Sequence, residues 1–278
     1  MNTTGLQLLH HSSNAVVLLP SQGAIARVAT GRHDVAQIRR SQDVARWLVE
    51  HHGFAATRPL PGADLVEVDA RTTVSFWVNY PQHAPPRPLT SAPLGCLLAD
   101  LHAIPDLPPD LPPWVPLDSL DHALHDDTAA VALDDTDRHW LLRRVNEVRD
   151  ELATLNWPLG DGLIHGDAWA GNLLWDAADY AEGRVVLGDW DRVAHGPREV
   201  DLIPTWHAAR RYGKGPGWTR DFIRHYGHDL TTWSGFRTLL ALRPRPDQRS
   251  TAPRAALPIP CPRPATTTLR TPRSRHPH

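Results

Sequence analysis

The chain has 278 residues, of which 41% are hydrophobic and 22% charged, a composition typical of folded globular proteins. Its formal net charge is −2, but eight Arg and one Asp give residues 243–278 a charge of +7, so residues 1–242 carry −9. An acidic body of this kind argues against nucleic-acid binding and favours cationic ligands. Cys96 and Cys261 are too few for a disulfide framework or a cysteine-based zinc site, and they favour a reducing compartment.

The start of the sequence lacks the pattern of a secretory signal. Its longest early apolar run, from Ala15 to Leu19, stops at Pro20, and no segment reaches the length needed to cross a membrane. We therefore expect a cytoplasmic protein with no membrane partner. A monomer is the starting expectation for its oligomeric state.

Residues 1–80 have the pattern of a small antiparallel sheet with one helix. Turn sequences around Ser13 and Gln22 separate short runs of β-prone residues. From Asp34 to His51 apolar residues recur at helical spacing, and Gly53 follows as a stop signal. We expect about five strands, with the helix after the third, at residues 6–9, 15–19, 24–29, 64–68 and 73–78.

A proline-rich linker over residues 80–90 leads into a mainly helical region. Helices are predicted before Pro105 and at residues 117–126, 135–155, 199–211 and 218–227. The apolar face of the longest is predicted to consist of Trp140, Leu141, Val145, Val148 and Leu152. The patterns together predict an α+β protein with an N-terminal lobe at 1–80 and a helical lobe at 81–242.

Residues 243–278 contain nine Pro and eight Arg and very few large apolar side chains. Such a segment cannot offset its ordering entropy, so we predict that it is disordered. The helical pattern of residues 232–242 stops abruptly before it, and we hypothesise that the tail is read from an altered frame or follows a truncation. Resequencing of the gene tests this, because an intact frame with no lost downstream coding sequence would contradict it. A basic tail that binds nucleic acid or membrane is the alternative.

Polar clusters follow two short apolar runs in the middle of the chain. Leu163-Ile164 precedes His165-Gly166-Asp167, and residues 185–187 precede Gly188-Asp189-Trp190-Asp191. If residues 172–175 and 186–189 pair as an antiparallel hairpin, paired numbers sum to about 361 and Asn172 lies opposite Asp189. Asp167 then lies on the loop that enters the same end. Facing oxygen ligands with a further carboxylate nearby suit Mg²⁺, whose other ligands are phosphate oxygens and water.

This arrangement is the one that phosphoryl transfer requires. A metal neutralises charge on the phosphates, while a separate Asp accepts or orients the attacking hydroxyl. The spacing from Asp167 to Asn172 equals that of the protein-kinase catalytic loop, and Asp189 falls where the kinase metal-binding Asp would lie.

The motifs HGDAWAGN at 165–172, GDWD at 188–191 and GPREVDL at 196–202 resemble those of the aminoglycoside phosphotransferase and choline kinase-like family. The resemblance implies a two-lobed, protein-kinase-like fold and an enzyme that uses ATP and Mg²⁺ to phosphorylate a small-molecule hydroxyl. It implies that Asp167 is the catalytic base and that Asn172 and Asp189 bind Mg²⁺. Asp201 would steady the catalytic loop from a buried position, and His165 is interpreted as structural.

The same resemblance requires a cation on the third strand to hold the α- and β-phosphates. Lys214 is the only lysine and lies after the catalytic segment, so Arg27 is the candidate. The acidic partner expected on the following helix falls on Ser41, and Asp43 or Glu50 could replace it. Asp191 is open to two interpretations, a second carboxylate near the metal or an exposed loop acid.

Two other functions stay open. A metal-dependent phosphoesterase could use the same carboxylates, and it would act without ATP. A catalytically impaired, nucleotide-binding pseudokinase is favoured if the segments that complete the substrate pocket are lost at the aberrant C-terminus. The sequence does not choose among an aminoglycoside-like antibiotic, an amino alcohol and a related metabolite as the acceptor.

Overall fold

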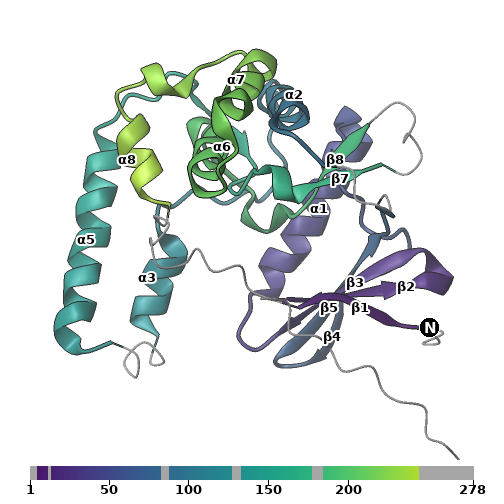
Figure 1. The fold of residues 1–278 in the computed structure, drawn as a ribbon. Coiled ribbons are helices and arrows are strands. Elements are labelled where there is room, and N and C mark those ends of the chain that lie inside the picture. The colour runs from purple at the N-terminus through teal and green to yellow at the C-terminus, as the bar shows by residue number, and fades with distance from the viewer. Residues whose placement is uncertain (1–4, 12–13, 83–87, 127–132, 177–183, 244–278) are drawn as a thin grey trace, which may run out of the picture. The chain divides into compact units, whose positions relative to one another are not determined.

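The computed structural model describes residues 5–11, 14–82, 88–126, 133–176 and 184–243 (Figure 1). Its N-terminal part is a five-stranded antiparallel sheet of order β1-β2-β3-β5-β4. Leu19, Ala24, Ala26 and Phe76 form a small buried cluster on this sheet, while the edge strands β1 and β4 are exposed. The five expected strands are confirmed as β1 Gln7–His11, β2 Asn14–Leu19, β3 Ala24–Thr30, β4 Val66–Asp69 and β5 Thr72–Val78.

Helix α1, Val35–His52, is inserted after β3 as predicted. Asp34 caps its N-terminus by accepting a hydrogen bond from the Ala36 amide at 2.9 Å. Gly53 ends it in the left-handed conformation, with φ of 61°, which glycine adopts without steric cost. Val44, Ala45 and Leu48 on its inner face are buried in the same core as the helices of the C-terminal part. The helix therefore belongs to both halves of the fold, and in Figure 1 it runs between the sheet and those helices.

The C-terminal part is mainly helical, as predicted. Its helices pack around Leu98, Leu101, Leu163, Ile164 and Leu202, each at most 1% exposed. None of the described helices is both long and apolar enough to span a membrane. The described helices are α2 Ser91–His102, α3 Asp118–His125, α5 Asp135–Ala153, α6 Glu199–Arg211, α7 Gly215–Tyr226 and α8 Phe236–Ala241.

Two short antiparallel strand pairs lie between α5 and α6. Strand β6, Asp161–Ile164, pairs with β9, Ala194–Pro197, and β7, Leu173–Trp175, pairs with β8, Val185–Leu187. Leu173 is paired with Leu187, so paired numbers sum to 360 and the predicted register was wrong by one residue. Asn172 therefore lies next to Gly188, whose amide donates to the Asn172 carbonyl at 2.8 Å. A register change of one residue moves each side chain to the other face, so Gly188 and not Asp189 is next to Asn172.

Helix α5 differs from expectation at Trp140 and, to a lesser degree, at Leu141, which is only partly buried. Val145, Val148 and Leu152 are buried, but Trp140 is 56% exposed. Five residues correspond to a rotation of about 140° around a helix, so Trp140 lies on a different face from Val145. The predicted disorder of residues 243–278 lies outside the described residues, apart from Arg243.

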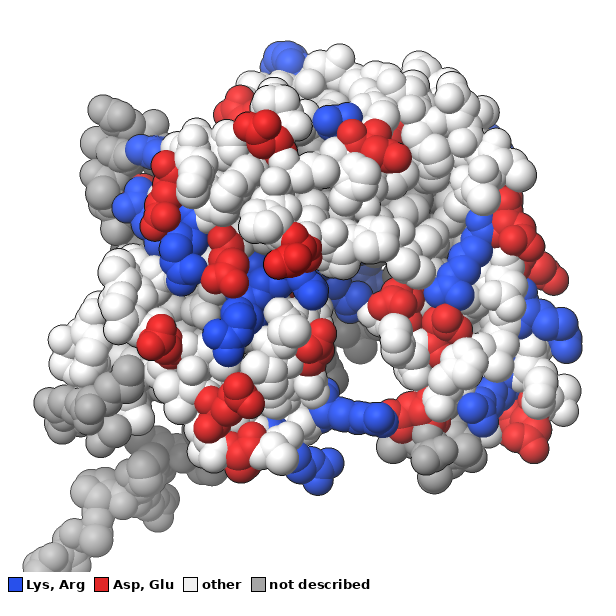
Figure 2. Space-filling view, turned by 180° about the vertical axis from the view of Figure 1, so that it is seen from behind, with Lys and Arg blue, Asp and Glu red and all other residues white. Residues whose placement is uncertain are grey.

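The surface carries both signs of charge. On the face seen in Figure 2, Lys and Arg side chains are interspersed with Asp and Glu side chains. As far as the described residues show, this face has no extended surface of one sign, which is the feature that attracts polyanions.

Helices α2 and α7 are in close contact at Gly95. A Cβ atom there would lie 2.9 Å from the Phe222 carbonyl and 3.1 Å from the His225 Cβ, too close for either to stay in place. We expect Gly95→Ala to lower the free energy of unfolding by about 1–3 kcal/mol, measured by urea denaturation, despite alanine's better helix propensity. The control is Gly217→Ala in α7, where only the end of Arg220 comes within 3.7 Å. That change should raise stability by up to about 1 kcal/mol, and equal effects of the two substitutions would contradict the packing argument.

Candidate active site

The catalytic-loop candidate begins where β6 ends, at His165-Gly166-Asp167. Gly166 has φ of 80°, and a Cβ atom at this position would collide with the backbone carbonyl of Arg192. Only glycine combines that conformation with so close an approach. The loop therefore packs against the segment that carries Asp189 and Asp191.

Asp201 holds this loop from the first turn of α6, the helix that follows β9. Its side chain is fully buried and accepts hydrogen bonds from the amides of His165 and Gly166, both at 2.7 Å. His102 Nε2 lies 3.1 Å from the same carboxylate. Burial alone would raise the pKa of Asp201, but the hydrogen bond and charge of His102, together with His165, lower it. The carboxylate is thus stabilised in its charged form.

His165 connects the two candidate loops. Its ring is fully buried and lies 4.7 Å from the Trp190 ring, measured between centroids. Its Nδ1 accepts from the Asp167 amide at 3.3 Å, so its Nε2 carries the proton that is donated to the Gly188 carbonyl at 2.9 Å. The ring thereby fixes the backbone of Asp167 relative to the residue before Asp189.

Asn172 and Asp189 lie at the same end of the β7–β8 pair. The Asn172 side-chain amide donates to the Asp167 carbonyl at 3.0 Å, which orients its oxygen away from that contact. Asp189 has φ of 65°, an uncommon conformation for a residue with a side chain, and its carboxylate is 47% exposed. Burial raises the pKa of Asp189, Arg27 lowers it, and the charges of Asp191 and Asp167 raise it further.

Arg27 reaches this segment from the middle strand of the sheet, where it pairs with Ser75 and Val16. Its Nη2 lies 3.3 Å from an Asp189 oxygen and 2.6 Å from an Asp191 oxygen. Burial opposes the charge of Arg27, but the charges of Asp191 and Asp189 raise its pKa above the ordinary value. Asp191 thus makes the shorter of the two acidic contacts of Arg27, and its side chain is 32% exposed, so it is more than a solvent-exposed loop acid.

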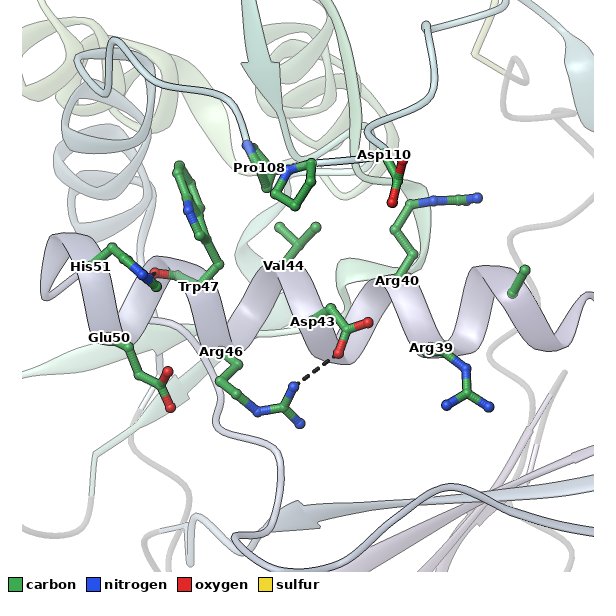
Figure 3. A pocket seen from close by; sticks show the side chains of 12 residues that line it. Arg39, Arg40, Asp43, Val44, Arg46, Trp47, Glu50, His51, Pro108 and Asp110 are labelled. Atoms are coloured by element: carbon green, nitrogen blue, oxygen red, sulfur yellow. Dashed lines mark hydrogen bonds and ion pairs between the residues drawn. The ribbon is translucent and has the colours of Figure 1, made fainter.

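The acids suggested on α1 lie elsewhere. Asp43 pairs with Arg46 at 2.9 Å, and Glu50 is on the same outer face of the helix (Figure 3). This face borders a cavity of about 460 Å³ between α1 and the loop around Pro108. Asp43 and Glu50 line this cavity, but none of the residues predicted as base, metal ligand or phosphate contact does, so we do not assign the predicted chemistry to it.

Arg243 is a contact that the sequence reasoning missed. Its Nη1 lies 2.8 Å from an Asp167 carboxylate oxygen, and both side chains are partly exposed. The residue stands at the start of the Pro/Arg-rich segment, where the sequence offers no signal for an active-site position. The structure thus places an arginine on the candidate base.

The oxygen donors fit a magnesium ion better than a softer metal. Among the described residues, no cluster of three or more His, Cys, Asp or Glu is arranged to hold a metal. Mg²⁺ needs only one or two protein ligands when phosphate oxygens and water supply the rest. The Asp189 carboxylate, the Asn172 amide oxygen and their partial exposure meet that requirement.

The Asp201 contacts predict a large loss of stability on isosteric substitution. Asp201→Asn removes the charge and turns an N–H group toward donors, so the free energy of unfolding should fall by about 3–5 kcal/mol at neutral pH. Glu199→Gln is the matched control on the same helix. Glu199 is also buried, but only its Oε1 is bonded, at 2.8 Å from the Leu159 amide, and burial raises its pKa. The Gln variant should be close to wild type or more stable.

The wild-type protein and the Asp201→Asn variant also test how stability depends on pH. Since the pKa of Asp201 is lower in the folded state, its contribution is complete above the ordinary value of 3.8 and is lost as pH falls further. The stability difference between wild type and Asp201→Asn should therefore be constant from pH 7 to about 5 and shrink in stronger acid. A difference that grows on acidification would contradict the assignment.

The fold is shared with solved kinases of small molecules. An aminoglycoside phosphotransferase from Streptomyces rimosus aligns with a TM-score of 0.61 and 19% identity over 86% of this chain and 91% of its own. A microcompartment-associated aminopropanol kinase aligns with 0.56 and 18%, over 86% and 81% of the two chains. A spectinomycin phosphotransferase in complex with ADP and spectinomycin aligns with 0.52 and 17%, over 88% and 85%. At these identities the likeness shows the fold.

A search of curated protein sequences gives no significant match. The sequence model of the phosphotransferase enzyme family known as APH, in contrast, matches residues 5–239, which include every predicted site residue. The chain therefore belongs to the APH phosphotransferase enzyme family.

Proposed function

We propose that this protein transfers the γ-phosphoryl group of ATP to a hydroxyl group of a small molecule that also carries an amine. The observation that supports this most directly is the loop anchored by Asp201. It brings Asp167 and Asn172 next to the segment of Asp189, which Arg27 contacts from the sheet. In the proposed function, this connected network would provide a base, oxygen donors for a metal and a cation for phosphates.

In the proposed reaction Asp167 accepts the proton of the acceptor hydroxyl. The acceptor oxygen then forms a bond to the γ-phosphorus, and the bond from that phosphorus to the β,γ-bridging oxygen breaks, which releases ADP. Asn172 and Asp189 would hold Mg²⁺, which when bound neutralises charge on the phosphates. Arg27 would balance further negative charge on the α- and β-phosphates. Asp201 and His165 would keep Asp167 in place through the loop backbone.

The amine on the acceptor is inferred from the Arg243 contact. Asp167 pairs with a guanidinium in this structure, and an ammonium group on the acceptor could take the same place. The acidic charge of residues 1–242 supports a cationic ligand as well. The fold relatives named for aminoglycosides, spectinomycin and aminopropanol guide the choice of test compounds. We propose the cytoplasm as the site of action, because ATP and Mg²⁺ are available there.

The direct test is ADP release by the purified protein with ATP or GTP and a panel of aminoglycosides, macrolides, choline-like amines and amino alcohols. We expect acceptor-dependent turnover with ATP that stops when Mg²⁺ is chelated. Release of phosphate from phosphoesters without any nucleotide would instead indicate a phosphoesterase. Nucleotide binding without turnover on any acceptor would indicate a pseudokinase.

Asp167→Asn should lower kcat by about 10²–10⁴-fold, because the amide cannot accept the proton of the acceptor. Affinity for ATP, measured by titration calorimetry, should change little. Asp161→Asn is the control, since it makes the same chemical change on an exposed side chain of the preceding strand. Turnover of Asp167→Asn within a few-fold of wild type would refute the role of Asp167 as base.

Arg243→Ala should lower KM for a cationic acceptor, because the substrate no longer competes with Arg243 for Asp167. The pair is partly exposed and worth at most about 1 kcal/mol, so the expected decrease in KM is about 2- to 5-fold. Arg237→Ala, on the exposed side of α8, should leave KM unchanged. An increase in KM for Arg243→Ala would mean that Arg243 binds the acceptor itself, which would favour an anionic group.

A further inference from the structure

The contacts of Asp191 support an inference that rests on the proposed function. We propose that Asp191 is the positioning carboxylate of Arg27, and that it replaces the acidic side chain which the sequence comparison places on α1. Asp191 would orient Arg27 toward the nucleotide phosphates without itself contacting them. The expected helix position holds Ser41, which supports Asp191 instead.

Asp191 and Arg27 form a bidentate ion pair. Arg27 Nη2 lies 2.6 Å from Asp191 Oδ2, and Nη1 lies 3.2 Å from Oδ1. Both ends of the planar guanidinium are thus engaged by one carboxylate, which fixes its direction as well as its position. The single Asp189 contact, at 3.3 Å, is longer and leaves that carboxylate 47% exposed. Asp191 therefore binds Arg27 through two hydrogen bonds, and Asp189 through one longer contact.

Helix α1 holds Asp191 from the other side with neutral groups. Ser41 Oγ donates to Asp191 Oδ1 at 3.1 Å, and the Gln37 side-chain amide donates to the Asp191 carbonyl at 2.6 Å. Gln37 and Ser41 are one helical turn apart and face the same way. Asp43 and Glu50 follow Ser41 by two and nine residues, which places them about 160–180° around the helix from it. Figure 3 shows both on one side of α1. In this chain the carboxylate next to Arg27 therefore comes from the loop, and α1 positions it through neutral side chains.

The residue between the two acids fixes the backbone of their loop. Trp190, between them, is fully buried and donates from its indole nitrogen to the Leu187 carbonyl at 3.1 Å. Its ring also packs on Phe54 with centroids 5.9 Å apart. Because the loop is anchored by Trp190, Asp189 can bind a cation while Asp191 holds Arg27 in place. Without Asp191, Asp189 would be the acidic contact of Arg27 given by the described ion pairs, and Arg27 would compete with the metal there.

A double-substitution cycle tests whether Asp191 acts through Arg27. We expect Arg27→Gln and Asp191→Asn each to weaken ATP binding by about 10-fold at fixed Mg²⁺, the loss of one charge-assisted interaction. The double variant should bind ATP no more weakly than Arg27→Gln alone. Multiplication of the two effects to about 100-fold would overturn the proposal. Asp191→Asn combined with Arg46→Gln, on the outer face of α1, is the control for independent effects.

A relocation experiment supplies a positive result. A cavity of about 10 Å³ borders Arg27, Ser41 and Asp191, and removal of the carboxylate in an Asp191→Ala background enlarges it for a longer side chain at position 41. Ser41→Glu with Asp191→Ala should recover at least half of the lost ATP affinity, whereas Ser41→Gln with Asp191→Ala should not. Equal affinities of the Glu and Gln variants, with both folded by circular dichroism, would overturn the proposal.

Two further readouts separate the possible failures. A higher Mg²⁺ requirement of Asp191→Asn that persists in the Arg27→Gln background would make Asp191 a metal ligand and overturn the positioning role. If wild type binds no ATP, the proposed function fails. The urea midpoints of the same four proteins then decide the pairing. Midpoint losses that do not add support it, and fully additive losses contradict it.

Discussion

The buried carboxylate of Asp201 is the interaction on which the candidate site depends. A charge without solvent must be matched by donors, and here these are two backbone amides of the catalytic-loop candidate and His102 from α2. His102 Nδ1 also lies 2.8 Å from the Tyr226 hydroxyl on α7. One carboxylate thus connects α2, α6 and α7 to the residues just before Asp167, and the loop conformation becomes a property of the whole helical part.

Helix α1 transmits that order to the sheet. Its inner face shares a core with α2 and β8, while Gln37 and Ser41 bind the loop that carries Asp189 and Asp191. After the helix, the Thr57 amide donates to the Leu187 carbonyl and the Leu187 amide to the Ala55 carbonyl. Arg27 on β3 completes this link through its contacts with Asp189 and Asp191. The position of Arg27 relative to Asn172 and Asp189 is therefore set by core packing and backbone hydrogen bonds, together with the ion pair between Arg27 and Asp191.

The sequence predicted the elements well and their mutual contacts less well. Strand alternation, the Asp34 cap and the Gly53 stop are local signals, so the sheet and α1 could be predicted. Strand β9 has the sequence Ala-His-Gly-Pro, which carries no strand signal and is extended because β6 offers it a partner. The β7–β8 register and the Arg243 contact depend on three-dimensional approach, and so does the choice of Asp191 over Asp43 or Glu50.

The arginines in the site suggest how ligands could enter without leaving carboxylates unpaired. Asp167 is paired with Arg243, and Asp189 and Asp191 are paired with Arg27. Under the proposed function, a cationic acceptor replaces the Arg243 guanidinium at Asp167. Mg²⁺ then balances the charge of Asp189 in place of Arg27. Each positively charged ligand then replaces an arginine that already pairs with the carboxylate. The cost of desolvating an unpaired carboxylate is therefore avoided at both steps. Because Asp191 keeps Arg27 in place through Ser41 and Gln37, the guanidinium remains available to the phosphates when Asp189 turns to the metal.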